Sequence, residues 1–250
     1  MEGIHDYSIV LFGYRAPTQM PDHCGTGTLV SSRNKYYILT AHHCAARLLK
    51  YERMCLAVRP SGVPLVIQRL EPIYIGDMKD KAWGPDLAFL RIHPVDKNKL
   101  DAVSHKLFYN LDRHVLNIEK PPQLGEGIWT LVGAPKLLTK VKEPRILEMP
   151  LMAYKITVKR SLIRRSFDYI EIGVPLNSPN ALKTFQGVSG GGLWHTDFSQ
   201  DSSGALKRAG RHRLVGCAFY ETEVKRKYRY IRCHGWRSIY EHGISKLPRG

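Results

Sequence analysis

Short apolar runs separated by turn residues recur along the whole chain, and they constrain its fold more than any other feature. Each run is rich in β-branched or aromatic residues and is bounded by Gly, Pro, Asn or charged residues, which is typical of strands and the turns between them. The runs cover residues 7–12, 27–30, 36–39, 65–70, 87–92, 128–132, 149–158, 169–174, 214–219 and 228–233. Only 45–52 and 237–247 have the character of helices. The pattern predicts an all-β barrel protein, and 250 residues are enough to bury a sizeable core in one two-lobed unit.

A single serine lies among glycines at 185–192, which reads Phe-Gln-Gly-Val-Ser-Gly-Gly-Gly. Glycine lets the backbone turn sharply and approach a substrate without a side chain in the way. Ser189 is therefore suited to attack as a nucleophile, while the backbone N–H groups of Gly187 and Ser189 are suited to stabilise an oxyanion. The signal is weak alone, because Gly-x-Ser-x-Gly also occurs in ordinary turns and in the nucleophile elbow of α/β-hydrolases.

A histidine and an aspartate in suitable contexts precede this serine. His43 lies in the segment Thr-Ala-His-His-Cys at 40–44, and Asp86 opens the run Asp-Leu-Ala-Phe-Leu. Taken singly, His43 fits a buried core histidine and Asp86 a turn residue. The chain order His, Asp, Ser is that of the chymotrypsin-type triad, whereas in α/β-hydrolases the acid and the histidine follow the serine. The set predicts His43 as general base, Asp86 as the carboxylate that orients it, and Ser189 as nucleophile.

Four segments together give the chain a resemblance to the trypsin-like (chymotrypsin-fold) serine proteases, as a non-secreted bacterial-type member. Residues 40–44 resemble the family's Thr-Ala-Ala-His-Cys, and 24–30 resemble the strand that leads toward that histidine. Residues 85–92 resemble its Asn-Asp-Ile-Ala-Leu-Leu-Lys-Leu, and 214–219 resemble the strand that follows the nucleophile. The resemblance implies a serine endopeptidase that cleaves protein or peptide substrates through an acyl-enzyme.

The same resemblance implies a fold and a division of the chain. It is an all-β fold of two six-stranded antiparallel barrels, with the active site in the cleft between them and a C-terminal helix. The expected N-terminal barrel covers 1–112, and the expected C-terminal barrel with its helix covers 113–250. A boundary near 110–123, which contains two consecutive prolines, suits this division.

Val188 departs from the pattern of the secreted members of the family. Those members carry Asp immediately before the nucleophile, where it pairs with a new N-terminal ammonium group after proteolytic activation. Valine cannot form that ion pair, so we expect no zymogen of the trypsin kind. The loop is then either preformed or ordered by a regulatory protein partner.

The sequence indicates less about the specificity pocket. The resemblance implies that it is lined by Lys183, Thr184, Ala218, Phe219, Tyr220, Glu221 and Tyr228. Lys183 near the pocket base argues against cleavage after basic residues and fits an acidic residue, although Glu221 could neutralise it. Tyr220 and Tyr228 favour a small residue if they point inward, so these alternatives stay open.

The chain is strongly basic, with 38 Lys and Arg against 22 Asp and Glu. The excess concentrates at 155–165, 207–213 and 225–232. Such a surface attracts polyanions, but solvated strand edges protected by Lys and Arg explain it as well. A protease-fold module that recruits nucleic acid or an acidic protein is therefore the alternative function, and nucleic acid is not the favoured partner.

The N-terminus lacks the pattern of a secretory signal, and no apolar run is long enough to span a membrane. If Met1 is the natural start, we expect a cytoplasmic enzyme, such as a partner-controlled effector in stress or phage (antiviral) defence. In a reducing compartment the five cysteines are expected to be thiols, although Cys24 and Cys44 lie where many secreted relatives have a bridge. No cofactor motif is present, and no paired short spacing supports a metal site.

Overall fold

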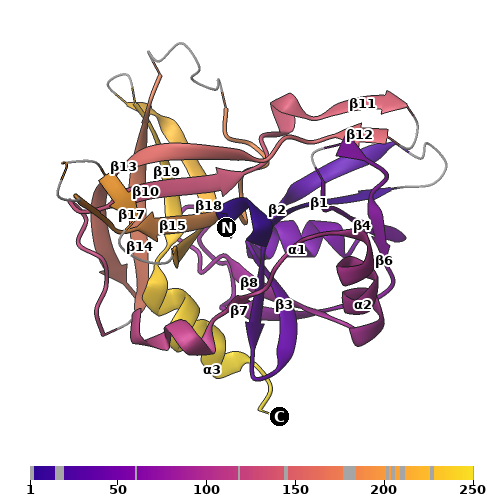
Figure 1. The fold of residues 1–250 in the computed structure, drawn as a ribbon, viewed down its shortest axis with the longest axis horizontal. Helices are drawn as coiled ribbons and strands as arrows, with labels where there is room; N and C mark the ends of the chain where they lie inside the picture. Colours follow the sequence, from indigo (N-terminus) through magenta and orange to yellow (C-terminus); the bar gives the residue numbers. More distant parts are fainter. Residues whose placement is uncertain are drawn as a thin grey trace.

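The computed structural model describes residues 3–14, 20–59, 61–117, 119–143, 146–176, 184–200, 203, 206–208, 212–225 and 228–249. Strands dominate these residues and form two sheet systems that lie side by side (Figure 1). One is a curled open sheet from the first half of the chain, and the other is a closed barrel from the second half. This arrangement is compatible with the two-barrel fold that the resemblance implies.

The first system is an antiparallel sheet with the strand order β6-β4-β1-β2-β3-β8-β7. Its strands are β1 (Ser8–Tyr14), β2 (Pro21–Ser32), β3 (Lys35–Thr40), β4 (Arg53–Ala57), β6 (Leu65–Ile67), β7 (Leu70–Ile75) and β8 (Leu87–Ile92). The short β9 (Tyr109–Asn110) pairs in parallel with β2.

The expected closure of this sheet into a barrel does not occur among the described strands. β6 and β7 are its two edges, and the chain between them bends around the buried carboxylate of Asp96. Oδ2 of Asp96 accepts hydrogen bonds from the N–H groups of Gln68 (3.0 Å) and Arg69 (3.1 Å). The side chain thus satisfies the two backbone donors of the bend between these edge strands.

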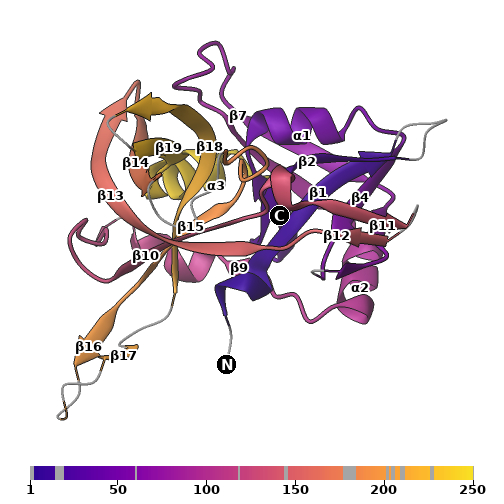
Figure 2. The ribbon, with the colours of Figure 1, turned by 90° about the horizontal axis from the view of Figure 1, so that it is seen from above.

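The second system is a closed barrel with the strand order β10-β13-β14-β19-β18-β15. Its strands are β10 (Ile128–Gly133), β13 (Met152–Arg164), β14 (Phe167–Pro175), β15 (Gly192–Thr196), β18 (Arg213–Lys225) and β19 (Tyr228–His234). A small sheet of β11 (Lys140–Glu143), β12 (Ile146–Glu148) and β5 (Ser61–Gly62) connects the two systems. A further hairpin of β16 (Phe198–Gln200) and β17 (Leu206–Arg208) projects away from the barrel (Figure 2).

Helices are short and connect or cover the sheets. They are η1 (Ile4–Tyr7), α1 (His42–Leu48), α2 (Pro94–Val103), η2 (Asp112–Asn117), η3 (Lys136–Leu138), the π-helix η4 (Ser238–Gly243) and α3 (Ile244–Lys246). The C-terminal helical segment is present as expected, but its central part, η4, is a π-helix between the α-helical positions 236–237 and α3. The helix after the histidine begins three residues earlier than 45–52, so it includes His43. α2 was not predicted: Pro94 occupies its first turn and the side chain of His93 accepts from the N–H of Val95 (3.4 Å).

The largest core cluster joins both systems. Phe89 of β8 and Tyr37 of β3 belong to it together with Trp194 of β15 and Ile172 of β14. Because apolar side chains from both halves pack in one cluster, the two sheets hold each other in a defined orientation. Within the described part of the chain, no helix combines the length and apolar character needed to cross a bilayer.

Candidate active site

Two neighbouring strands bring His43 and Asp86 together. β3 ends at Thr40, which lies opposite Ala88 of β8, so the residues just beyond these two positions meet at one edge of the sheet. Oδ2 of Asp86 lies 2.6 Å from Nδ1 of His43, and Oδ1 accepts a hydrogen bond of 3.0 Å from the N–H of His43. The carboxylate is buried, whereas 40% of the His43 side chain is exposed. Asp86 therefore orients the ring with Nδ1 inward.

The pKa of His43 is raised. Burial of the ring opposes protonation, but this effect is outweighed by Sγ of Cys44, 3.4 Å from Nε2, and by the hydrogen bond to Asp86. The neighbouring His42 takes no part in this pairing, since its ring stacks on Tyr74 with 4.0 Å between centroids. The structure thus brings His43, and not His42, to the carboxylate.

Sequence reasoning missed His234, which fixes the other side of Asp86. Its Nε2 accepts a hydrogen bond of 2.9 Å from the N–H of Asp86. The ring is fully buried, and burial lowers the pKa of His234 to about 3, so the imidazole is neutral and its Nε2 lone pair is free to accept. No motif surrounds this histidine at the end of β19, and only the three-dimensional pairing reveals its role.

The loop that carries Ser189 has two peptide groups with their carbonyl ends pinned. The carbonyl oxygen of Gln186 accepts from the N–H of Lys136 (2.7 Å), and that of Val188 accepts from the N–H of Gly191 (2.8 Å). Because a trans peptide is planar, its N–H points away from its carbonyl. The N–H groups of Gly187 and Ser189 therefore face the opposite way, and neither donates to an acceptor among the described residues.

Gly187 is required by the backbone of this loop. Its φ is +96°, in the left-handed region, and a Cβ built there would lie 2.5 Å from Cε1 of His23. An L-residue at this position would be strained and would collide with the buried His23 ring. The free N–H of Gly187 thus depends on the absence of a side chain.

Thr26 of β2 and the side chain of Val188 hold the loop from beneath. Thr26 donates its N–H to the carbonyl oxygen of Ser189 (2.8 Å) and its hydroxyl to that of Gly187 (2.9 Å). The same hydroxyl accepts from the N–H of Ala134 (2.9 Å). Val188 is 1% exposed and packs closely on Gly133. A Cβ built at Gly133 would lie only 2.5 Å from Cγ1 of Val188. The loop is ordered by contacts within the chain.

Ser189 lies near His43 without a direct hydrogen bond between their side chains in this structure. Oγ of Ser189 donates to the carbonyl oxygen of Phe219 (3.4 Å). Sγ of Cys44 lies 3.4 Å from Nε2 of His43 and 3.5 Å from the carbonyl oxygen of Ser189, so one thiol contacts both residues. All five cysteines are buried and free, and Cys24 and Cys44 are not bridged.

The residues predicted to line the specificity pocket are brought together in part. Glu221 accepts from the hydroxyl of Thr184 (3.1 Å) and the N–H of Phe185 (3.1 Å), and it pairs with Arg229. Its carboxylate is thus already engaged. Ala218 and Phe219 lie against the serine loop. Tyr220 lies beside Arg232, and Tyr228 lies beside Tyr230 and Lys159. Lys183 lies outside the described residues.

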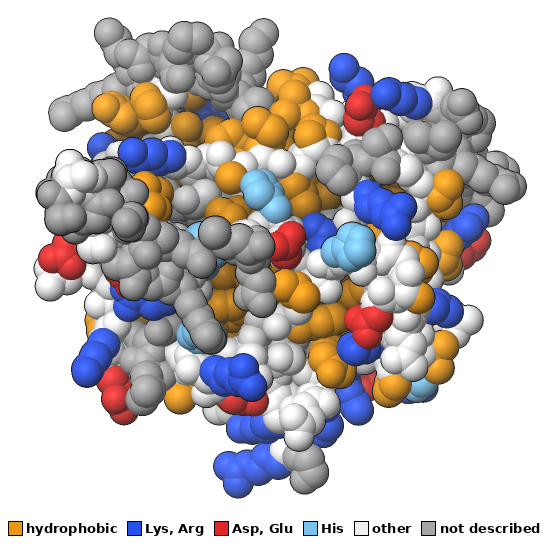
Figure 3. All heavy atoms as spheres, in the orientation of Figure 1, with side chains coloured by type: hydrophobic (Ala, Val, Ile, Leu, Met, Phe, Trp, Pro, Cys, Tyr) orange, Lys and Arg blue, Asp and Glu red, His pale blue; other side chains and the backbone are white. Residues whose placement is uncertain are grey.

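Arginines of β13 and β19 are paired with carboxylates. Glu171 pairs with Arg160 (2.5 Å) and Arg232 (2.7 Å), and Asp80 pairs with Arg164 (3.5 Å). Figure 3 shows hydrophobic side chains and histidines near the middle of one face, with Lys and Arg spread around its outline beside Asp and Glu.

Comparison of the sequence with models of protein families gave no match. A search of curated proteins gave no match either.

Proposed function

We propose that this chain is a serine endopeptidase of the trypsin-like class, with His43, Asp86 and Ser189 as its triad. The observation that carries the proposal is the 2.6 Å contact between Asp86 and Nδ1 of His43, which leaves Nε2 on the side of the Ser189 loop. The N–H groups of Gly187 and Ser189, which bind no acceptor among the described residues, add the second element that acyl transfer requires.

The proposed reaction begins with attack of Ser189 Oγ on the scissile carbonyl carbon. Nε2 of His43 takes the hydroxyl proton, and Asp86, 2.6 Å from Nδ1, stabilises the imidazolium that forms. The N–H groups of Gly187 and Ser189 stabilise the tetrahedral oxyanion. His43 then passes the proton to the leaving amine, and water releases the acyl group by the same steps in reverse order.

The missing Ser189–His43 hydrogen bond is compatible with this proposal. In free enzymes such bonds are often long or poorly aligned, and they tighten only when substrate is bound. Sγ of Cys44 contacts both Nε2 of His43 and the carbonyl oxygen of Ser189, so the two residues lie close together around this thiol.

We further propose that the serine loop needs no N-terminal ion pair. Val188 in the apolar core and the hydroxyl of Thr26 supply the contacts that an aspartate and an ammonium group supply in secreted members. Of the two alternatives that the sequence leaves open, these contacts favour a preformed loop.

A fluorophosphonate probe tests the proposed function directly, since it labels only an activated serine. We expect the purified chain to be labelled, Ser189→Ala to lose the label and Ser161→Ala, on the exposed face of β13, to retain it. A chain without label, or one that keeps its label in Ser189→Ala, would exclude the proposed nucleophile.

A further inference from the structure

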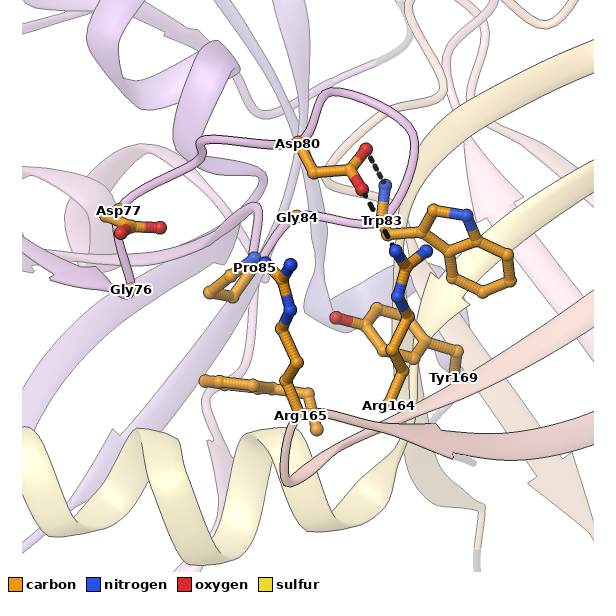
Figure 4. Close-up of a pocket in the computed structure, with 10 residues that line it drawn as sticks. Gly76, Asp77, Asp80, Trp83, Gly84, Pro85, Arg164, Arg165 and Tyr169 are labelled. Carbon is orange, nitrogen blue, oxygen red and sulfur yellow. Dashed lines mark hydrogen bonds and ion pairs between the residues drawn. The ribbon is translucent and has the colours of Figure 1, made fainter.

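A pocket of about 350 Å³ lies between the β7–β8 connection and the tip of the β13–β14 hairpin. Its apolar wall consists of Trp83, Pro85, Phe167 and Tyr169. Figure 4 shows the side chains of Arg164 and Arg165 rising from the hairpin tip into the same space, with Arg165 directed toward Pro85. The pocket is large enough for a side chain but small among ligand sites.

The pocket is next to the proposed catalytic residues. Pro85 immediately precedes Asp86. On the opposite wall, the ring of Tyr169 lies 6.0 Å from that of Phe219, whose carbonyl oxygen accepts from Oγ of Ser189. A polypeptide bound at Ser189 therefore has this pocket within reach of its neighbouring residues.

The carboxylates that line the pocket are already engaged. Asp77 pairs with Lys79 (2.9 Å). Asp80 accepts from the N–H groups of Ala82 (3.0 Å) and Trp83 (3.1 Å) and pairs with Arg164 (3.5 Å). No unpaired carboxylate therefore remains in the pocket lining to neutralise a further cation.

Arg165 is that further cation. Among the described residues its guanidinium group has no ion pair and no hydrogen bond, and the side chain is exposed. It lies at a two-residue turn in which Arg165 (φ 51°) and Ser166 (φ 70°) both have positive φ, and the pair Arg164↔Phe167 closes the turn. The short hairpin thus presents the guanidinium group at a fixed point of the rim.

On the opposite side of the pocket, two arginines hold the ring of Trp83 in place. The guanidinium carbon of Arg232 lies 3.4 Å from the centre of the Trp83 ring, and that of Arg164 lies 5.0 Å from it. Arg232 is itself buried and pairs with Glu171 (2.7 Å). Trp83 is therefore a fixed apolar wall.

We propose that this pocket binds an acidic side chain of the polypeptide substrate. The carboxylate pairs with Arg165, whose planar group suits a two-oxygen acceptor, and the methylene groups pack on Pro85 and the aromatic wall. With one unpaired cation the pocket suits a single carboxylate rather than a polyanion such as nucleic acid. The inference rests on the proposed peptidase function and adds a substrate class to it.

Matched peptides test the inference. A peptide library cleaved by the wild-type chain identifies a preferred sequence, and the peptide is then compared with twins in which each Glu or Asp is replaced by Gln or Asn. We expect one such replacement to lower kcat/KM by about tenfold to a hundredfold, the range of a charge-assisted hydrogen bond. In Arg165→Ala this difference should disappear, and in Arg165→Glu a further peptide with Lys at that position should become the better substrate.

Arg113→Ala provides the control, because Arg113 is exposed in η2 and far from this hairpin in sequence. It removes the same charge and should keep the acidic preference. Fluorophosphonate labelling of Arg165→Ala at the wild-type rate shows that Ser189 is unaffected.

The outcomes separate the two proposals. If the wild-type chain is labelled and cleaves peptides without an acidic preference, or if Arg165→Ala keeps that preference, the pocket assignment is wrong and the peptidase proposal stands. If the wild-type chain is not labelled and cleaves nothing, the peptidase proposal fails and the pocket assignment fails with it.

Discussion

Replacement of Thr26 by valine tests whether the hydroxyl of this residue orders the serine loop. Valine keeps the shape of threonine but removes the hydrogen bond to the carbonyl oxygen of Gly187 and the acceptor for the N–H of Ala134. The hydrogen bond to Ala134 is buried, so its N–H is left unsatisfied at a cost of about 1–3 kcal/mol, whereas the bond to Gly187 is partly buried and its loss costs about 0.5–1.5 kcal/mol. Together the two losses lower the free energy of unfolding by about 1.5–4.5 kcal/mol.

The effect on reactivity should exceed the effect of lost stability alone. Release of the Gly187 carbonyl frees the adjoining peptide groups to rotate, and loss of one oxyanion donor slows acyl transfer by about a hundredfold to a thousandfold. Since Gln186 and Val188 stay pinned by their own hydrogen bonds, we expect a smaller loss, of about tenfold to a hundredfold.

Urea unfolding and the rate of fluorophosphonate labelling measure the two effects separately. Thr26→Ser keeps the hydroxyl and is the matched control, so it should label at nearly the wild-type rate. Two results would refute the reasoning. A Thr26→Val chain that is less stable but is labelled at the wild-type rate would limit Thr26 to a structural role, and a Thr26→Ser chain as slow as Thr26→Val would show that the hydroxyl is not the cause.

Two further predictions concern the same region. Gly187→Ala places a Cβ 2.5 Å from Cε1 of His23 at a φ of +96°, so labelling should slow by at least about a hundredfold while circular dichroism stays unchanged; unchanged labelling would contradict the assigned loop geometry. Burial lowers the pKa of His23 to about 4 and that of His234 to about 3, below the ordinary 6.5, so the unfolded chain binds these protons first and stability falls as the pH drops below 6.5. Together they should lower the free energy of unfolding by about 3–4 kcal/mol between pH 6.5 and 5, and urea titrations with a flat profile over this range would show that the two rings are not buried neutral.

Many of the strands, and the meeting of His43 with Asp86, could be predicted from the sequence because their signals are local. A short, nearly continuous apolar run marks β8, which begins and ends where the sequence predicts. The contexts of His43, Asp86 and Ser189 each lie within a few residues, and the structure brings His43 to Asp86 as expected.

The features that the sequence did not reveal depend on contacts between distant residues. The bend between the edge strands β6 and β7 is held by Asp96, whose carboxylate accepts from backbone groups 27 and 28 residues earlier. The orientation of the Gly187 peptide follows from Lys136, on a helix that no local pattern predicted. Local propensity carries no information about which distant group will satisfy a given donor or acceptor.

The hydrogen bond from the N–H of Asp86 to His234 has a consequence for the order in which the site is assembled. The two residues are 148 positions apart, and the histidine lies at the end of the last barrel strand. During synthesis the N-terminal sheet emerges first, with His43 and Asp86 already in place along the chain but with the Asp86 amide unsatisfied. The ribosome must synthesise β19 before this amide can bond to its acceptor, and Ser189 is already part of the chain by then. A chain that ends before β19 would therefore contain His43, Asp86 and Ser189 but lack the acceptor for the Asp86 amide, so its carboxylate would be held less firmly.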